Sequence, residues 1–368
     1  QGTRDLIILM EDSLPTDLSE ALKYCLDDKN VYDAKYKKFN TLPNYKFKFP
    51  IPEQVQQKFK PFEFKNSKVV SEMQFALLEE DGKTPKQFIT KAQLMVMDLI
   101  VSNNWERPIY FAVTTGGDAY MGLEPYFQLE GLAYRLTPVY HEDYDQRNNN
   151  AGGVAADIMY DNVMNKFQWG NIDKEKVYLD ENARRMVVNL RMQMNNLAEQ
   201  FIIEGRKEMA VNVLKKSLES LPEENAPYDQ AQIMWQTAEL LFKAGDVESA
   251  KILVKRMIEL NQQVFTYSMS LDKDRRKSLE KEVQIAGLIN DEMIQDLLEF
   301  APNDPLTAEL KASHEKSLKD VGLLDLIKGE REKKILFEEE KRKYDSAMDA
   351  LKKSDTLVPS EKKDSVKK

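Results

Sequence analysis

Cysteine and histidine are nearly missing from the 368-residue chain, which has one cysteine, Cys25, and two histidines, His141 and His314. A single cysteine excludes an intrachain disulfide and a cysteine-based zinc site. The two histidines lie too far apart in sequence to suggest a pair of metal ligands, so we expect no metal site. A lone cysteine in an amphipathic segment is typical of a small core residue rather than of a nucleophile.

Long apolar runs and an excess of positive charge are also missing. The longest apolar runs, such as LMVMDLI at 94–100, fall well short of the roughly 18 residues that a membrane span needs, so we predict no span here. The formal net charge is -9, which argues against nucleic-acid binding because that function needs a basic surface. The chain opens on QGTRD without a signal peptide, which suggests a fragment of a longer protein.

Residues 1–150 mix strand-like and helix-like runs and hold most of the prolines, which predicts an α+β or α/β domain. We expect Asp17 to cap one helix, with Glu20 completing a capping box, and Thr90 to cap another. Tyr45, Phe47 and Phe49 alternate before two prolines, which is typical of an edge strand. We further expect a buried strand at 107–114, another strand at 132–140 and a short helix at 123–131 between them, and the clearest loop at 145–157.

Residues 151–312 show helical periodicity with an internal repeat, which predicts an all-α tetratricopeptide-like superhelix. The repeat units span 191–222 and 231–264, a degenerate third spans 271–302, and flanking helices could cap the array. A 40-residue offset relates five pairs of positions: Met194 and Met234, Ala198 and Ala238, Phe201 and Leu241, Gly205 and Gly245, and Ala210 and Ala250. The predicted organisation ends with a charged helix at 313–353 and a disordered tail at 354–368.

The first helix of each repeat predicts a concave groove that suits an extended peptide or a neighbouring domain. The tentative groove residues are Met192, Asn195, Glu199, Ile202, Gln232, Trp235, Glu239 and Phe242. Trp235 has a second interpretation, in which it packs beneath a flanking helix.

The stretch 103–140 contains charged residues in aromatic surroundings, and it allows two interpretations. One is a polar site formed by Asp118, Glu124, Tyr126, Glu130 and Arg135. The other is a set of buried or half-buried ion pairs that fix the fold, which we favour because no histidine, cysteine or serine nucleophile accompanies them. We assign no catalytic residue.

Two further motifs have ordinary structural explanations beside functional ones. TTGGDAYMG places Gly116 and Gly117 where a phosphate loop could form, but it matches no known phosphate-binding pattern, and a simple turn explains it. His141, Glu142, Asp143 and Asp145 could hold a divalent ion, and an acidic surface loop is the commoner explanation.

Several long motifs together resemble one protein family: NNWERPIYFAV, YMGLEPYFQLEGLAYRLTPV, DIMYDNVMNKFQWGNI and VYLDENARRM, with the repeats. Through most of residues 1–265 the chain is similar to the C-terminal region of bacterial multi-pass membrane glycosyltransferases related to protein O-mannosyltransferases. The resemblance implies a parent enzyme that uses a polyprenyl-phosphate sugar donor, with its catalytic carboxylate outside this sequence. It implies no cofactor in this fragment and a location on the periplasmic side of the bacterial inner membrane.

These observations lead to one preferred function and two alternatives. The preferred function is a non-catalytic extracytoplasmic domain of a membrane protein O-glycosyltransferase, whose partners are an acceptor protein or peptide and the membrane domain of the same chain. The first alternative is a free-standing tetratricopeptide scaffold of an envelope complex. The second is a self-contained hydrolase working through Glu124, Glu130 and Asp118.

Overall fold

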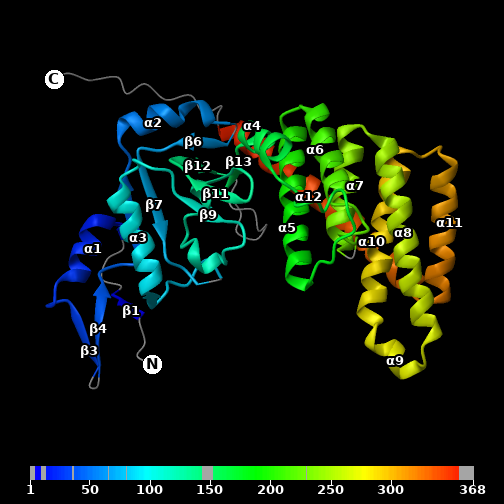
Figure 1. Ribbon diagram of the computed structural model, residues 1–368, viewed down its shortest axis with the longest axis horizontal. Helices are drawn as coiled ribbons and strands as arrows, with labels where there is room; N and C mark the ends of the chain where they lie inside the picture. Colours follow the sequence, from blue (N-terminus) through cyan, green and yellow to red (C-terminus); the bar gives the residue numbers. More distant parts are fainter. Residues whose placement is uncertain are drawn as a thin grey trace, which may run out of the picture. The chain divides into compact units, whose positions relative to one another are not determined.

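The computed structural model describes residues 5–9, 14–34, 37–64, 66–79, 81–142, 152–228 and 230–355. The chain divides into two compact units, the first comprising Gln1–Pro227 with Lys243–Gly245 and the second comprising Tyr228–Phe242 with Asp246–Lys368. The N-terminal region is α+β and is followed by a run of helices (Figure 1), which confirms the predicted fold class.

The described strands of the first unit form four small sheets, with the orders β3-β4-β1-β8, β13-β10-β11-β9, β12-β6 and β2-β5-β7. The strands are β1 (Asp5–Ile8), β2 (Thr16–Asp17), β3 (Val31–Ala34), β4 (Lys37–Leu42), β5 (Lys46–Pro50), β6 (Ser67–Val69), β7 (Glu72–Ala76), β8 (Phe88–Thr90), β9 (Tyr110–Ala112), β10 (Phe127–Leu129), β11 (Ala133–Leu136), β12 (Val139–His141) and β13 (Gly153–Val154).

Short helices connect and cover these sheets (Figure 1). They are α1 (Leu18–Leu26), α2 (Glu53–Phe59), η1 (Lys60–Phe62), α3 (Lys91–Asn103), η2 (Gly117–Ala119), η3 (Glu124–Tyr126), α4 (Ala156–Asp161) and the π-helical turn η5 (Asn162–Lys166). The Asp17 side chain caps α1 by accepting from the N–H groups of Ser19 and Glu20, and Thr90 and Gln93 form a capping box on α3. Both predicted cap residues are confirmed, but the predicted capping box with Glu20 is wrong, because only the Asp17 side chain caps α1. Cys25 is buried in α1.

An aromatic cluster holds the sheet β13-β10-β11-β9 together. Phe127 stacks on Tyr134, and Phe111 and Tyr120 pack against Phe127 with ring centroids 4.9 and 5.2 Å away. Beside this cluster, the Tyr126 hydroxyl donates to the Gln74 carbonyl at 3.0 Å and accepts from the Gln74 N–H at 2.8 Å. Tyr126 thereby gives the open edge of β7 the hydrogen bonds that another strand would supply. Burial raises the pKa of Tyr126 to about 12.

Several local predictions for the first unit are wrong. β5 is a central strand rather than an edge strand, because it pairs with β2 on one side and with β7 on the other. Its Phe47 and Phe49 side chains are buried. The expected helix at 123–131 is instead the turn η3 followed by β10, because Phe127 and Leu129 alternate into the aromatic core. β9 is an edge strand with Tyr110 exposed, so the segment 107–114 is not fully buried.

The first unit ends in a hairpin of two long helices, α5 (Glu181–Ile203) and α6 (Lys207–Ser220). The buried Arg191 guanidinium of α5 donates to the carbonyls of Leu221, Ala226 and Pro227 at 2.8, 2.7 and 3.3 Å. The Asn225 amide donates to the carbonyls of Ile172 and Glu175, both at 2.6 Å, and its oxygen accepts from Val177 N–H at 2.9 Å. These bonds fix the segment that closes the unit.

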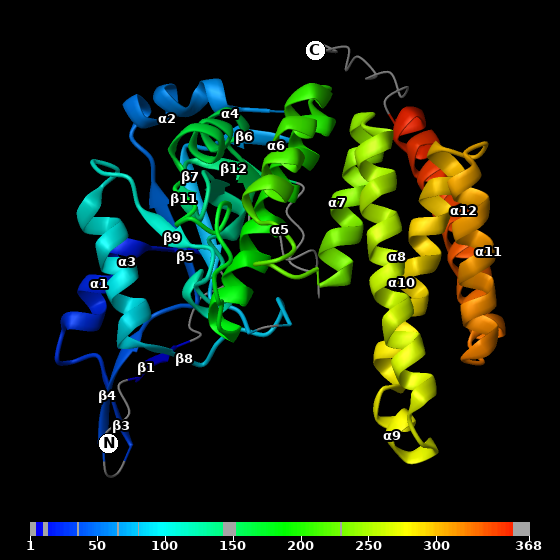
Figure 2. The same cartoon turned by 45° about the vertical axis from the view of Figure 1, so that its right-hand side comes forward.

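The second unit is built from α7 (Ala231–Ala244), α8 (Val247–Ser270), α9 (Lys273–Ser278), α10 (Glu280–Phe300), α11 (Pro305–Asp320) and α12 (Leu324–Asp355). Figure 2 shows α8, α10 and α11 side by side. Polar contacts tie them, since Asn261 of α8 donates to Asn290 of α10 at 2.7 Å and Lys251 of α8 pairs with Asp304, the cap of α11, at 2.5 Å.

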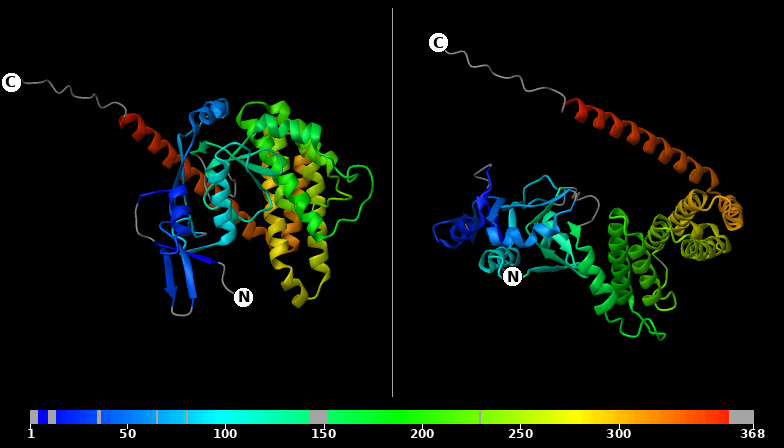
Figure 3. Two further views of the ribbon diagram at one scale, coloured as in Figure 1. Left: turned by 60° about the vertical axis from the view of Figure 1, so that its left-hand side comes forward. Right: turned by 90° about the horizontal axis from the view of Figure 1, so that it is seen from above.

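Among the residues whose side chains the structure describes, α12 is anchored to the second unit at its N-terminal part. Ile327 is buried, and Arg331 forms a two-pronged ion pair with Asp291 of α10. The residues from Glu332 to Lys343 are exposed, and Figure 3 shows the helix extending beyond the other helices of its unit. The predicted boundary at 313 is wrong, because 313–320 completes α11 and the terminal helix starts at Leu324. Most of the predicted tail lies outside the described residues.

The two hairpins α5–α6 and α7–α8 turn in the same way. Gly205 and Gly245 both adopt a positive φ, 77° and 98°, which glycine tolerates best. In each hairpin, the N–H of the residue after the glycine donates to the carbonyl oxygen five residues earlier. Arg206 donates to Phe201 at 2.8 Å, and Asp246 donates to Leu241 at 2.9 Å. The structure therefore reproduces the 40-residue offset of the sequence. A tetratricopeptide superhelix stays a prediction. Every helix among the described residues is too short or too polar to serve as a membrane span.

Candidate functional site

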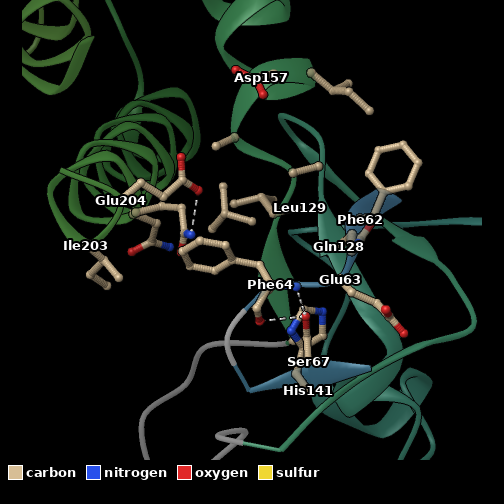
Figure 4. Close-up of a pocket in the computed structure, with 18 of the residues that line it drawn as sticks. Phe62, Glu63, Phe64, Ser67, Gln128, Leu129, His141, Asp157, Ile203 and Glu204 are labelled. Atoms are coloured by element: carbon tan, nitrogen blue, oxygen red, sulfur yellow. Dashed lines mark hydrogen bonds between the residues drawn. The ribbon is translucent and has the colours of Figure 1, made fainter. Parts of the chain in front are cut away.

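The first unit contains a cavity of about 720 Å³, shown in Figure 4. Four parts of the chain form most of its lining: η1 with the segment after it, strand β10, the stretch from Gly152 through the start of α4, and the C-terminal part of α5 with Arg206. Tyr134 and His141 complete the lining. A cavity of this size is in the range of sites that bind small molecules or a few residues of a peptide.

The wall formed by β13 includes two adjacent glycines, Gly152 and Gly153, at positions where a side chain would clash. At Gly152 a β-carbon would lie 1.9 Å from the Phe127 carbonyl oxygen, and the residue has a φ of 66°. At Gly153 a β-carbon would lie 2.2 Å from Cε1 of the His141 ring. Both positions therefore require glycine if β13 is to pair with β10 and His141 is to keep its place in the wall. The predicted loop at 145–157 is thus wrong from Gly153 onward, and residues 143–151 lie outside the described residues.

Arg206 carries the positive charge of the cavity wall. Its guanidinium bonds Asp157 at 2.5 Å and Glu204 at 3.0 Å, and it lies over the Phe201 ring with 4.6 Å to the centroid. The hydrogen bond to Asp157 and the pairing with Glu204 raise the pKa of Arg206 above its usual value, against the effect of desolvation. The three charged groups thus form one network at the junction of α4, α5 and α6.

The opposite wall carries two exposed aromatic rings. Phe62 and Phe64 expose 39% and 43% of their surfaces, although apolar rings of this size are usually buried. Figure 4 shows the Phe64 ring reaching toward the end of α5 near Ile203 and Glu204. Between the two phenylalanines, the Glu63 carboxylate accepts from Val69 N–H at 2.8 Å. The wall therefore presents apolar faces next to a carboxylate.

The five residues of the predicted polar site do not meet at one centre, although two of them pair with each other. Glu130 is buried and pairs with Arg135 at 3.2 Å, and it accepts from the Tyr110 hydroxyl at 2.6 Å. Arg135 also lies over the Phe59 ring at 5.2 Å. Glu130 and Arg135 form the buried ion pair of the structural interpretation.

The other three members lie in other surroundings. Asp118 is largely exposed and pairs with Lys86 at 2.7 Å, whereas Tyr126 bonds the backbone of Gln74. Desolvation raises the pKa of the Glu124 carboxyl above its usual value. The structure therefore shows no common centre of contacts for the five residues.

The predicted groove residues divide between the two units. Met192, Asn195, Glu199 and Ile202 lie on α5, and Gln232, Trp235, Glu239 and Phe242 lie on α7. Asn195 and Phe242 are buried, and Phe242 stacks on Phe300 with 5.2 Å between ring centroids. Trp235 is half-buried and donates from Nε1 to Asp296 of α10 at 2.9 Å. Peptide binding by the set stays a prediction.

Two smaller motifs have simple structures. Gly116 and Gly117 lead into the turn η2, and a β-carbon at either position would meet nothing within 4 Å. Glu142 pairs with Lys68, and the acids at 143 and 145 lie outside the described residues. Within the part of the chain that the structure describes, no group of three or more histidine, cysteine, aspartate or glutamate side chains is placed to hold a metal ion.

Sequence reasoning singled out Glu199, His141 and Tyr134 among the residues that line the cavity, each for a different site. The Gly152–Gly153 pair was the signal that could have located it, because adjacent glycines often mark the close approach of another segment. The other walls come from segments that are far apart in sequence, so no spacing pattern connects them.

A family model described as TMEM260-associated domain 2 matches residues 1–158. The matched region spans all of the sheets and ends within α4, so it covers three of the four walls of the cavity but not α5. No curated protein and no solved structure matches the chain. The N-terminal region is thus similar to a domain associated with a membrane protein, TMEM260.

Proposed function

We propose that the chain is a non-catalytic extracytoplasmic part of a membrane-embedded protein O-glycosyltransferase and that it engages the acceptor protein. The observation that carries this proposal is the match of residues 1–158 to a TMEM260-associated domain. The same region carries two of the four long motifs on which the resemblance to O-mannosyltransferase-like enzymes rests, NNWERPIYFAV and YMGLEPYFQLEGLAYRLTPV. The parent enzyme would take its sugar from a polyprenyl-phosphate donor at a catalytic carboxylate outside this chain, on the periplasmic side of the membrane.

The contacts of the charged residues support a non-catalytic role. A glycosyl-transferring or glycoside-cleaving centre needs a carboxylate that is open to its substrate. Glu130, the most buried of the predicted carboxylates, instead lies in an ion pair with Arg135. The helical hairpins that follow offer extended surfaces of the kind that bind protein segments.

The alternative function is a scaffold for an envelope protein complex. The observation that favours it is the equivalence of the two hairpins, with Gly205 and Gly245 at the same position of the turn. Arrays of helical hairpins commonly bind proteins without doing chemistry. This alternative needs no transferase in the same polypeptide.

The first test is the reading frame that contains the chain. Several apolar spans upstream and in frame support the transferase, whereas a signal peptide directly before the chain supports the scaffold. The second test deletes residues 1–368 from the parent and maps glycosylated peptides in the membrane fraction by mass spectrometry. We expect loss of glycosylation with the membrane part still inserted. Unchanged glycosylation of every acceptor would contradict the proposal.

A further inference from the structure

The strand β13 forms one wall of the cavity, and no strand among the described residues pairs with its outer side. β13 pairs in parallel with β10 and is the outer strand of its sheet. Ala155 N–H donates to Leu129 O at 3.0 Å. Because alternate residues of a strand point their backbone groups to opposite sides, the N–H and C=O of Val154 point away from β10. An exposed strand edge of this kind pairs readily with an added extended segment.

The side chain of Gln128 adds a second hydrogen-bonding group. Gln128 lies on β10, directly beside Gly153, and lines the cavity although only 4% of its surface is exposed. No residue that the structure describes forms a hydrogen bond with its amide group. The amide atoms of Gln128 are not among the buried atoms that lack a partner, so they open to the cavity and are available to a ligand there. An amide both donates and accepts, so its natural complement is another amide, such as a peptide bond.

The charges of the cavity favour a basic ligand. The wall carries Glu63, Asp157, Glu199 and Glu204 against Arg206, and Arg206 already pairs with Asp157 and Glu204. Glu199 lines the cavity from α5 and has no ion-pair or hydrogen-bond partner for its carboxylate among the described residues. The exposed ring of Phe64 offers a flat face that attracts a cation.

We infer that the cavity binds an extended segment of another polypeptide, which adds to the edge of β13 and places an arginine or lysine side chain at Glu199. Gln128 bonds a peptide group of the segment, and the rings of Phe62 and Phe64 cover its side chains. This inference holds whether the parent protein is a transferase or a scaffold. It differs from the proposed repeat groove in placing the ligand in the first unit.

The test measures binding of a fluorescein-labelled peptide, Ser-Thr-Val-Arg-Val-Thr-Ser, to the full chain by fluorescence anisotropy. Two altered probes accompany it: one with citrulline in place of arginine, and one N-methylated at alternate backbone nitrogens. We expect each alteration to weaken binding about tenfold or more, through loss of the charge-assisted bond and of the strand pairing, respectively. These probes leave the protein unchanged, so folding defects cannot imitate the result.

Protein variants locate the site. We expect Gln128→Leu and Glu199→Gln each to weaken binding about tenfold, whereas Glu208→Gln, an exposed carboxylate on α6 outside the cavity, leaves it unchanged. Gln128→Leu should leave the melting temperature nearly unchanged, because the amide forms no hydrogen bond with a described residue.

Other outcomes overturn the inference. They are absence of binding, equal binding of all three peptides, or binding that is insensitive to Gln128→Leu and Glu199→Gln. If binding instead falls in Trp235→Ala and not in Gln128→Leu, the ligand occupies the helical repeats. That result would support the proposed groove and reject the cavity as the site.

Discussion

The His141 ring lies directly against the Cα of Gly153, so that a β-carbon at residue 153 would fall 2.2 Å from its Cε1. We expect Gly153→Ala to displace the ring and to lower the free energy of unfolding by about 1–3 kcal/mol, the usual cost of overpacking. Urea unfolding monitored by circular dichroism measures this loss. The matched control is Gly116→Ala, where a β-carbon would meet nothing within 4 Å.

A double variant tests the cause of that loss. His141→Ala removes the ring, so Gly153→Ala in that background should cost much less than in the original chain. Gly152→Ala should not be rescued, because its β-carbon would meet the Phe127 carbonyl oxygen at 1.9 Å rather than the ring. Equal losses in both backgrounds would show that the ring contact does not matter.

The alanines of the two helical hairpins form the second test. Ala210 and Ala250 are completely buried at equivalent positions of the repeat. Tryptophan at either position should overpack the hairpin and lower the free energy of unfolding by about 1–3 kcal/mol. Thermal melting checks this, with Ala92→Trp on the exposed face of α3 as the control. Unchanged melting of both buried variants would refute the alignment of the repeats.

The Glu130–Arg135 pair supplies the third prediction. Glu130→Gln leaves the Arg135 guanidinium, which is 20% exposed, without its carboxylate. Because breaking a buried ion pair strands one charge, we expect a loss of about 3 kcal/mol in the free energy of unfolding. Chemical denaturation measures it, and Glu106→Gln, at an exposed position, is the control. The combination Glu130→Gln with Arg135→Met should recover part of the loss. No recovery would mean that the Tyr110 bond carries the effect.

The buried His314 makes the second unit sensitive to acid. It lies on α11, its side chain is 2% exposed, its Nε2 lies 3.8 Å from Asp291 of α10, and Arg331 of α12 and Glu315 also act on it. Desolvation lowers the pKa of His314 to about 4 from 6.5. The unfolded chain therefore binds this proton more readily, so stability that is present above pH 6.5 is lost as the pH falls toward 4.

The full loss in the free energy of unfolding that the titration of His314 causes is on the order of 3 kcal/mol. Other groups also titrate over this range, so the informative quantity is the difference between the original chain and His314→Leu in urea unfolding at pH 7.0, 5.5 and 4.5. We expect the original chain to lose more stability than the variant as the pH falls. Parallel losses would show that His314 does not cause the acid sensitivity.

Local signals in the sequence predicted the local structure well. The caps Asp17 and Thr90 and the turn glycines Gly205 and Gly245 satisfy backbone requirements within a few residues, so their patterns are readable from the chain alone. The central position of β5 could not be predicted from the sequence, because it depends on tertiary pairing with β2 and β7. The short strand β10 resembled a helix because Phe127 and Leu129 sit among residues with mixed propensities.

The cavity could not be predicted for a related reason. Its strand β13 pairs with β10, about 25 residues earlier, and no local pattern encodes a parallel pair of two residues. The side of β10 to which Gln128 points depends on that register. Glu199 was singled out as a groove residue from its helical position alone, without any indication that it faces the first unit's own cavity.

The bonds that Arg191 and Asn225 make with the last turns of the first unit have a practical consequence for dissecting the protein. All of the carbonyls that Arg191 holds, up to Pro227, belong to that unit, as do the three backbone groups bound by Asn225. A protease that cleaves after Pro227 would sever the chain without removing any of these bonds. Cleavage between Leu221 and Ala226 would instead separate the buried guanidinium from two of these three acceptors, those of Ala226 and Pro227.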